Sequence, residues 1–451
     1  MNTANASLNT QKAWNTIDAK ENRNINWTKV QRKVFKLQKR IFQAVQSGQK
    51  AKARKLQQLL LKSHSAKLFA LRQVIQNNRR KQTLVHPQKV IFNKDRAMQT
   101  LVKLALEPYW EARWSRESYG CQPAKSIHDA IESLFQGVAK SPKYILRGKI
   151  VNCLDEINHT YLLSKLDFPK TLKTTIKQWL KKGIISDDLS PLLVNIALDG
   201  MSKDAMDSFL NQFNQGETTE EREKPMVIRY VDDFLVLHQS KEVVLQFQQS
   251  ITQWLENRGF PLLPGATRIC HTLYELDIDG KHEKPGFDFL GFNVRQYPTG
   301  KHKSFKHSCL NYRTLIKPSS QSIQAHYQAI VKVVNQYKHA PQRELIGQLN
   351  PIIEQWSHHY SRVSSSQVFS KLDSMIMSKL RAWIKTRTGA TGKKQASLYF
   401  RDGINGSRTF QTKEGHYLIT HRKVGQKQYR DFASLEDCTH DKGLITESRV
   451  Q

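Results

Sequence analysis

The strongest periodic pattern in the chain lies near its start, from about Trp27 to Asn78. Apolar residues recur there three or four positions apart, the spacing of one face of an α-helix, and lysines and arginines fill the positions between them. Gly48 interrupts the pattern. The apolar set is Val34, Leu37, Ile41, Phe42 and Val45 before Gly48, and Leu56, Leu59, Leu60, Leu68 and Leu71 after it. The pattern predicts a hairpin of basic amphipathic helices.

Between about His86 and Tyr297 the pattern becomes a mixture of helix and strand. The segment KYILRGKIVNCLDEINH, Lys143–His159, predicts a strand followed by a turn into a helix. Leu189–Met201 is apolar enough for a buried helix. In MVIRYVDDFLVLH, Met226–His238, two apolar runs flank a pair of acids, which predicts a strand, a tight turn and a second strand. Gly286–Tyr297 predicts another strand pair.

From about Lys306 to Thr388 the spacing is helical again, and the residues after it form only short strand-like pieces. Trp356 and Tyr360 lie four residues apart in this region. They either belong to the buried face of a helix or present their rings to RNA bases. Helical ends around a mixed middle section predict an α+β protein.

The net charge adds a polyanionic partner to this picture. The chain has 451 residues, 39% of them hydrophobic, which is enough for two or three domains. Its 71 Lys and Arg against 39 Asp and Glu leave a formal charge of +32. Such a charge repels itself on folding, so it indicates nucleic acid as the partner, with a merely well-solvated basic surface as the alternative. No apolar run approaches the about 20 residues that span a bilayer, so we expect no membrane partner.

Two further features exclude other classes of protein. The five cysteines are far apart and form no C-x-x-C pair, which argues against a zinc ribbon or a disulfide framework. The first 24 residues have neither the apolar core of a secretory signal nor the acid-free, arginine-rich composition of a transit peptide. These features fit a reducing compartment, and a protein of this kind that works in an organelle is expected to be made there.

The candidate chemistry lies in IRYVDDFLVLH, where Asp232 and Asp233 stand between the two apolar runs. Nucleotidyl transfer uses two Mg²⁺ ions, one to activate the attacking hydroxyl and one to stabilise the leaving pyrophosphate, and Mg²⁺ prefers carboxylate oxygens. Asp also favours turns for local hydrogen-bonding reasons, so the pair has a purely structural interpretation as well.

Several ordered segments resemble one family, the group II intron reverse transcriptases and maturases. DRAMQTLVKLALEPYWEARW, SYGCQPAKSIHDAIESLF, NCLDEINHTYLLSKL, LSPLLVNIALDGM, IRYVDDFLVLH and GFDFLGFNVR are similar to its polymerase blocks, in order. NWTKVQRKVFKLQKRIFQAV resembles its N-terminal RNA-binding region, and RELIGQLNPIIEQWSHHYSRV through LRAWIK resembles its maturase, or X, domain, which serves as the thumb. The resemblance implies a right-hand polymerase fold, group II intron RNA as the partner, and assistance to splicing. The family occurs in bacteria and in organelles, so we expect a protein that is encoded in an organelle, foremost a plastid, or that works in a bacterial cytoplasm.

The main departure from the family pattern is Lys149. The family places its first catalytic Asp in the strand before NCLDEINH, where this chain has Lys149, and Asp155 aligns with a later acid. Unit charges about 4 Å apart, at an effective dielectric of about 20, interact by about 4 kcal/mol. A divalent ion would lose a ligand and gain a repulsive neighbour. We expect a vestigial metal site in which Asp232 and Asp233 cap the turn or pair with Lys149, and Mg²⁺ as a cofactor only if some polymerase activity remains.

Other departures point the same way. Gln122 and Lys125 stand where the family has arginines for the triphosphate, and Arg grips a phosphate bidentately whereas Lys is a point charge. The family's nucleotide-pocket element P-Q-G is replaced by a shortened stretch with Asp187 and Asp188, and its E-K-T by Gly265, Ala266 and Thr267. VHPQKVIFNK runs directly into DRAMQ, so part of the fingers is expected to be missing.

The sequence thus predicts an α+β, right-hand polymerase-like protein in five segments. These are a polar tail (1–24), a basic helical RNA-binding region (25–85), reverse-transcriptase-like fingers and palm (86–305), a helical maturase domain (306–390) and an extension without an HNH endonuclease (391–451). The expected RNA contacts are Arg32, Lys33, Lys36, Lys39, Arg40, Lys52, Arg54, Arg381, Lys385 and Arg387, the last three of which can alternatively complement a helix dipole. The expected function is that of a maturase that has lost polymerase activity, and the alternative is an active RNA-directed DNA polymerase.

Overall fold

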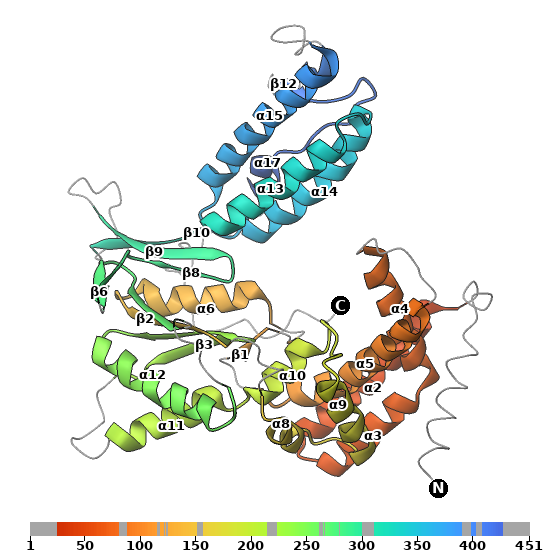
Figure 1. The fold of residues 1–451 in the computed structure, drawn as a ribbon, viewed down its shortest axis with the longest axis vertical. Coiled ribbons are helices and arrows are strands. Elements are labelled where there is room, and N and C mark those ends of the chain that lie inside the picture. Colours follow the sequence, from red (N-terminus) through yellow and green to blue (C-terminus); the bar gives the residue numbers. More distant parts are fainter. Residues whose placement is uncertain are drawn as a thin grey trace, which may run out of the picture. The chain divides into compact units, whose positions relative to one another are not determined.

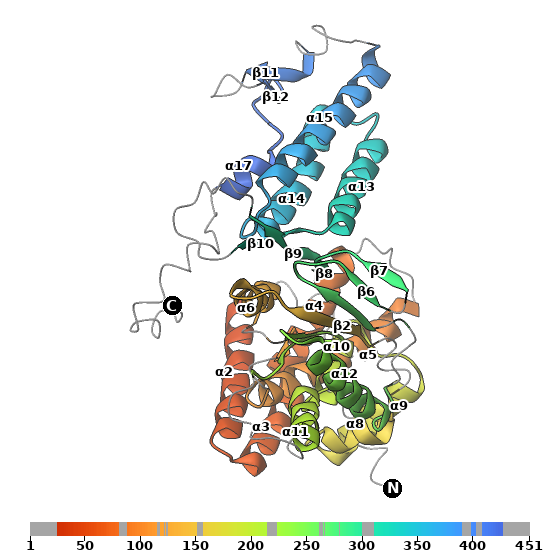
Figure 2. The same ribbon diagram turned by 90° about the vertical axis from the view of Figure 1, so that its left-hand side faces the viewer.

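The computed structural model describes residues 25–80, 88–114, 118–120, 122, 125–150, 157–213, 223–260, 265, 267–278, 280–299, 311–389, 398–402 and 408–426. The chain divides into two compact units, which are described separately below. The first contains residues 1–134 and 144–269, and the second contains residues 135–143 and 270–451. Figure 1 and Figure 2 show the elements of both units from two directions.

The first unit begins with a block of helices rather than the single hairpin that the sequence predicts. Asn26 caps the first helix, because its side chain accepts a hydrogen bond from the Lys29 amide at 2.9 Å. Gly48 has φ +71° and separates this helix from the next, as predicted. The second predicted stretch is two helices, since Ser63 takes an extended conformation between them. The block consists of α2 Trp27–Gln46, α3 Lys50–Lys62, α4 His64–Arg80 and α5 Gln88–Glu111.

The centre of the first unit is a five-stranded sheet in the order β1-β3-β4-β2-β5. β4 runs antiparallel to both β3 and β2, while the short β1 runs parallel to β3. All residues of β4 from Phe234 to His238 are buried, as expected for a central strand covered on both faces. The strands are β1 Ser118–Tyr119, β2 Tyr144–Lys149, β3 Met226–Tyr230, β4 Asp233–His238 and β5 Thr267–His271.

The first unit also contains six helices within the described residues, and two of them are joined by a partly buried polar contact. The indole of Trp254 on α12 donates to the Asp204 carboxylate on α11 at 2.8 Å, and Arg258 also reaches Asp204. The helices are α6 Ile127–Ala139, α8 His159–Lys165, α9 Lys170–Lys181, α10 Ser190–Ala197, α11 Met201–Phe213 and α12 Lys241–Glu256. α10 carries Pro191 in its first turn and six buried residues, so the predicted buried helix is confirmed.

The second unit combines a three-stranded antiparallel sheet, in the order β10-β9-β8, with three long helices. Gly291 and Leu290, both at positive φ, form the tight turn between β8 and β9. The strands are β6 Leu276–Ile278, β7 Lys281–Glu283, β8 Phe287–Phe289, β9 Phe292–Pro298, β10 Tyr312–Pro318, β11 Phe400–Asp402 and β12 Arg408–Phe410. The helices are α13 Ser320–Gln336, α14 Gln342–Tyr360, α15 Ser366–Thr388 and the short α17 His421–Gln426.

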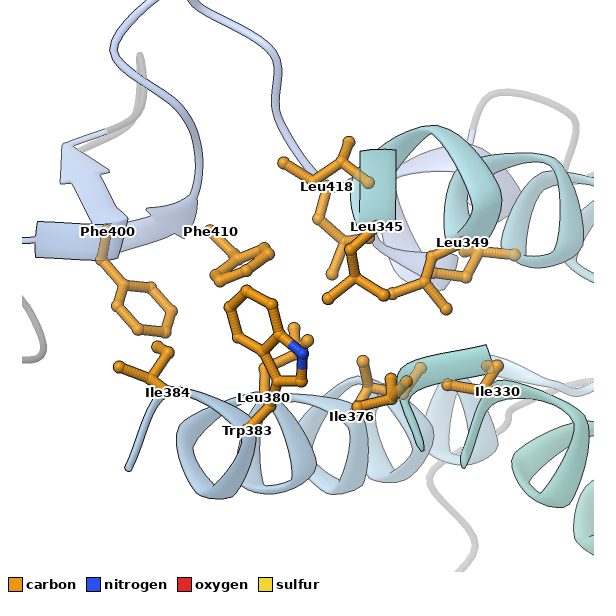
Figure 3. Close-up of a cluster of buried hydrophobic side chains, with 13 residues drawn as sticks. Ile330, Leu345, Leu349, Ile376, Leu380, Trp383, Ile384, Phe400, Phe410 and Leu418 are labelled. Atoms are coloured by element: carbon orange, nitrogen blue, oxygen red, sulfur yellow. The ribbon is translucent and has the colours of Figure 1, made fainter. Parts of the chain in front are cut away.

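A hydrophobic cluster joins the helices of the second unit to its last strands (Figure 3). Trp383 of α15 packs edge-on against Phe410 of β12, with ring centroids 6.1 Å apart. Its indole donates to the carbonyl of Tyr337 at 3.1 Å, which satisfies the buried N–H. The remaining members of the cluster are Ile330, Val334, Leu345, Ile346, Leu349, Ile353, Ile376, Leu380, Ile384, Phe400 and Leu418.

The predicted α+β class is confirmed: helical blocks stand at both ends and a mixed section lies between them. Within the described residues, no helix combines the length and the apolar character needed to cross a bilayer. The five predicted segment boundaries remain predictions.

Candidate functional site

The two acids of the YVDD stretch lie at a two-residue hairpin, as the sequence predicts. Tyr230 and Asp233 are cross-strand partners, so the loop between β3 and β4 consists of Val231 and Asp232. Val231 has φ +57°, a value at which a β-branched residue is strained and glycine is usual. Asp232 is therefore the turn residue proper, and Asp233 is already the first residue of β4.

A buried guanidinium supports this strained turn. Arg229 is only 3% exposed and donates to the carbonyl of Val231 at 2.9 Å. It also donates to the side-chain carbonyl of Asn195 on α10, at 2.7 Å, and to the hydroxyl of Ser118 on β1, at 2.7 Å. The three acceptors lie on three different elements. Arg229 thus fixes the hairpin to α10 and to β1.

The segment Ser118-Tyr119-Gly120 closes over the other side of the turn. The backbone amide of Val231 donates to the carbonyl of Tyr119 at 3.3 Å, and the side-chain Nδ2 atom of Asn195 donates to the carbonyl of Gly120 at 2.7 Å. Gly120 has φ +81°, and a Cβ placed on it would lie 2.8 Å from Val231 Cγ2. Only glycine fits here, both for its backbone conformation and for the close approach of the hairpin.

Lys149 lies directly opposite Asp233. It is the last residue of β2, and the two residues are partners in the antiparallel register of β2 and β4. The next residue extends the pairing, because the amide of Ile150 donates to the carbonyl of Asp232 at 2.9 Å. The side chain of Lys149 is exposed, whereas Asp232 and Asp233 are both half-buried. Lys149, the residue expected to stand in place of a catalytic carboxylate, is therefore the cross-strand neighbour of Asp233.

The carboxyl of Asp233 is poorly compensated. Its Oδ1 atom is buried and accepts no hydrogen bond. Burial raises the pKa of Asp233 above its ordinary value; the nearby Lys149 ammonium lowers it, and the neighbouring Asp232 raises it further. Burial outweighs the lysine, so the charged form of Asp233 is disfavoured in the folded protein. Among the described residues, no group of three or more His, Cys, Asp or Glu side chains is placed to hold a metal ion.

Lys125 and Gln122, which were expected at the position of a triphosphate, make contacts within the protein or are buried. The ammonium of Lys125 donates to the carbonyl of Ser118 at 2.9 Å and lies 4.8 Å from the centre of the Tyr119 ring. Gln122 is only 7% exposed, and its amide nitrogen is buried without a hydrogen-bond partner. Neither side chain extends freely into solvent.

The shortened stretch before α10 is held by α5. The side chain of Gln99 donates to the carbonyl of Ile184 at 2.8 Å and accepts from the amide of Ser186 at 2.6 Å. The two acids that follow, Asp187 and Asp188, are exposed. The expectation that part of the fingers is missing stays a prediction.

Of the positions that replace the family's E-K-T element, two can be placed. Gly265 is exposed at φ +83°, and the Thr267 hydroxyl accepts a hydrogen bond from Gln248 at 3.2 Å. Ala266, like Asp155, lies outside the described residues.

Most of the predicted RNA contacts lie on exposed surface of the N-terminal helix block. The charge of this block is one-sided: residues 22–94 contain 19 Lys and Arg and no Asp or Glu. The exposed set that the sequence predicts comprises Arg32, Lys33, Lys36, Lys39, Arg40 and Lys52.

Arg54 has a protein partner instead. Its Nε atom donates to Asp167 Oδ1 at 2.6 Å, and its Nη2 atom lies 2.5 Å from the same oxygen. Tyr109 donates to the other carboxylate oxygen at 2.7 Å. Burial raises the pKa of Asp167, but these hydrogen bonds outweigh it and leave the pKa below its ordinary value. Arg54 therefore joins α3 to the connection between α8 and α9.

The three cations near the end of α15 differ among themselves. Arg387 donates to the carbonyls of Lys338 and Ala340, the latter at 2.5 Å, and stacks 4.6 Å above the Trp383 ring. It fastens the loop that follows α13, which neither the RNA nor the dipole interpretation foresaw. Arg381 and Lys385 are exposed on α15.

The predicted aromatic pair lies within the second unit's interior. Tyr360 is 4% exposed and donates to the carbonyl of Gly291 at 3.1 Å, while the Trp356 ring stacks on His326 with centroids 4.5 Å apart. His326 in turn contacts His421, with their Nε2 atoms 2.8 Å apart, and His421 Nδ1 lies 2.7 Å from Asp373. This placement favours the core interpretation of Trp356 and Tyr360.

Sequence reasoning missed Arg229, Asn195 and the Asp373–His421–His326 chain. An arginine inside an otherwise apolar strand run, IRYV, is a usable signal for a buried structural cation. The histidine chain has no such signal, because its members come from positions 95 residues apart.

Comparison with known proteins gives three family matches along the chain. Residues 23–103 match the N-terminal domain of reverse transcriptase, residues 79–294 match reverse transcriptase (RNA-dependent DNA polymerase), and residues 323–400 match the group II intron maturase-specific domain. The three matches follow one another in the order that the resemblance predicts.

Individual relatives are distant and overlap this chain in part. Protein YkfC of Escherichia coli is 26% identical over 52% of this chain and 69% of its own length. Maturase-like protein 1 of Euglena longa is 24% identical over 40% of this chain and 52% of its own length. The group II intron-encoded protein LtrA of Lactococcus lactis is 25% identical over 50% of this chain. The chain thus spans about half the length of the Euglena relative and 41% of LtrA.

A solved structure of telomerase from Candida albicans, in complex with a fragment of telomeric RNA, matches with a TM-score of 0.29 and 13% identity. The match covers 61% of this chain and 47% of that one. The family matches carry the assignment. The chain belongs to the group II intron reverse transcriptase and maturase family.

Proposed function

We propose that this protein is a maturase-like RNA-binding protein that assists the folding and splicing of a group II intron and has lost polymerase activity. The observation that carries the proposal is the register of β2 and β4, which sets Lys149 against Asp233. The splicing chemistry itself is left to the RNA. The protein neutralises phosphates and holds the RNA structure in place.

The charges at the hairpin support the loss of polymerase activity. Two Mg²⁺ ions need several carboxylate oxygens in close array, and here an ammonium occupies the place of one carboxylate. The remaining Asp233 is half-buried, and Lys149 occupies the cross-strand position opposite it. On this proposal the residues do not fit the two-metal site of the family.

The surroundings of the hairpin agree with this. Transfer of a nucleotide requires cationic or hydrogen-bonding groups directed at the triphosphate. Lys125 donates to a backbone carbonyl of its own segment, and Gln122 is buried. Replacing Lys149 alone therefore does not supply a working site.

RNA binding is supported by the N-terminal helix block. The predicted contacts on α2, together with Lys52 on α3, lie on exposed surface, and residues 22–94 contain no carboxylate. The relatives LtrA and maturase-like protein 1 carry group II intron and maturase in their names. The proposal also includes a bacterial or organelle origin of the chain. It includes a group II intron RNA as the partner and the predicted contact residues as its binding surface.

The second candidate is an active RNA-directed DNA polymerase. It is favoured by the hairpin itself, which keeps Asp232 and Asp233 at the bend and anchors them through Arg229. A catalytic site that had lost all function would be free to lose this support.

The two candidates are separated by measuring both activities on one preparation. Splicing of a group II intron RNA is followed at low Mg²⁺ with and without the protein, beside primer extension on an RNA template. The proposal predicts faster splicing and no nucleotide incorporation. Incorporation that requires Asp232 and Asp233 would establish the polymerase instead, and the absence of any effect on splicing would refute the maturase role.

A matched variant tests the part that Lys149 plays. Lys149→Asp restores a third carboxylate opposite Asp233, so it should bind Mn²⁺ at least about a hundredfold more tightly than the natural chain, by electron paramagnetic resonance. Primer extension should remain absent, because Lys125 and Gln122 are unchanged. Equal Mn²⁺ binding by the two proteins would show that Lys149 is not what disables the site.

A further inference from the structure

A groove between α2 and α3 combines cations with an apolar floor. It has a volume of about 350 Å³ and is lined by Lys33, Lys36, Leu37, Arg40, Leu59, Lys62 and Ser63. The four cations are exposed, and none of them forms an ion pair with a residue that the structure describes. Their charge is therefore available to a ligand.

The sign of the ligand follows from the surroundings. α2 and α3 contain no Asp or Glu, and neither do the flanking residues from 22 to 94. Four cations around one concavity attract an anion with more than one charge, and a run of phosphodiesters meets that requirement. The groove is thus complementary in charge to an RNA strand.

The floor of the groove restricts which part of an RNA fits. Leu59 is 50% exposed and Leu37 is half-buried, so the groove offers aliphatic surface that a phosphate does not cover. The apolar face of a nucleotide base can cover this aliphatic surface. In a duplex the bases are stacked and paired inside, whereas in loops and bulges they are free to turn outward. A volume of about 350 Å³ also lies within the range of small-ligand sites, about 300–1,000 Å³.

We propose that this groove binds an unpaired nucleotide of RNA, with the base against Leu37 and Leu59 and the flanking phosphates on the four cations. The inference rests on the proposed RNA-binding function and deepens it. It assigns recognition of unpaired RNA to one concave site, in addition to the general attraction that the whole basic block exerts.

The test compares a single strand with a duplex on the full chain. The probes are a short unstructured oligoribonucleotide and a blunt RNA duplex of equal length, and their binding is followed by fluorescence anisotropy over a range of salt concentrations. Leu59→Ala removes the floor and should weaken binding of the single strand about five- to tenfold. Binding of the duplex should change less than twofold. Leu59 is half-exposed, so the substitution leaves the packing of α3 intact.

Two further variants serve as references. Leu245→Ala removes a leucine of similar exposure, 39%, from α12 and should leave both probes unaffected. Lys36→Gln should weaken both probes and lower the salt dependence of single-strand binding by about 0.7 in the log–log slope. A slope that does not change would show that Lys36 does not contact phosphate.

The outcomes separate this inference from the function on which it rests. Unchanged single-strand binding by Leu59→Ala, or equal weakening of strand and duplex, overturns the groove while leaving RNA binding in place. If the natural chain binds neither probe in a salt-dependent way, the proposed function fails as well.

Discussion

Lys149 and Asp233 face each other across β2 and β4, and the lysine ammonium only partly offsets the rise that burial causes in the pKa of the Asp233 carboxyl. The pair therefore differs from an ordinary surface ion pair. The Asp233 carboxyl has one buried oxygen without a hydrogen-bond partner. Retaining this carboxyl lowers the stability of the folded protein. Its effect can therefore be measured by substituting Asp233.

Asp233→Asn should raise the free energy of unfolding at neutral pH. The folded-state pKa of Asp233 is raised, so its contribution to stability is full below the unfolded pKa, about 3.9, and is lost as the pH rises through the folded value. The amide avoids that loss. We expect a gain of no more than about 1 kcal/mol, because the carboxyl is partly exposed and water screens it. Urea denaturation at neutral pH and near pH 4 checks this: the gain should shrink at the lower pH, and a gain that grows there would contradict the assignment.

Gly120→Ala should destabilise the protein by about 3 kcal/mol. The positive φ costs about 1 kcal/mol for any residue with a Cβ. The rest comes from the Cβ itself, which would lie 2.8 Å from Val231 Cγ2, a branched side chain with little freedom to move. Gly183→Ala is the matched control, since Gly183 has φ +61° and nothing within 4 Å of its Cβ position. Equal losses in the two variants would show that Gly120 and the hairpin are not in close contact.

The second unit should lose stability on mild acidification through His326. Burial, together with the neighbouring His421, lowers the pKa of His326 to about 3. Its contribution is therefore present above the unfolded pKa of about 6.5 and is lost as the pH falls toward the folded value. This amounts to about 2 kcal/mol at pH 5. Between pH 8 and pH 5, the midpoint temperature of thermal unfolding should fall less for His326→Gln than for the natural chain. An equal fall in the two proteins would exclude His326 as the cause.

The sequence predicts both Arg54 and Lys33 as RNA contacts. Substituting them should nevertheless have different effects on stability and on RNA affinity. Arg54→Gln breaks its ion pair with Asp167, so we expect a loss of about 1 kcal/mol in stability and a change of less than twofold in RNA affinity. Lys33→Gln should leave stability unchanged and lower the salt slope of RNA binding by about 0.7. Denaturation and filter binding on both variants check this. A larger RNA defect in Arg54→Gln than in Lys33→Gln would reverse the assignment.

The sequence was sufficient for features that depend on local pattern. The strand–turn–strand of YVDD, the break at Gly48 and the buried α10 all follow from periodicity and turn chemistry, and the family blocks located Lys149. Contacts between distant residues were beyond its reach. Arg54 and Asp167 are 113 residues apart, and nothing in the local sequence distinguishes Arg54 from the exposed cations around it. Arg387 was likewise expected to reach RNA or a helix dipole, but it donates to a loop 47 residues earlier.

The central claim is that Lys149 has replaced metal-dependent polymerisation with a structural role for the hairpin. Primer extension by the natural chain on an oligo(dT)-primed poly(rA) template, in Mg²⁺ and again in Mn²⁺, tests it most directly. An active reverse transcriptase and the Asp232→Asn/Asp233→Asn double variant are run in parallel. We predict that the natural chain and the double variant give the same background signal. Extension by the natural chain that the double variant abolishes would contradict the account.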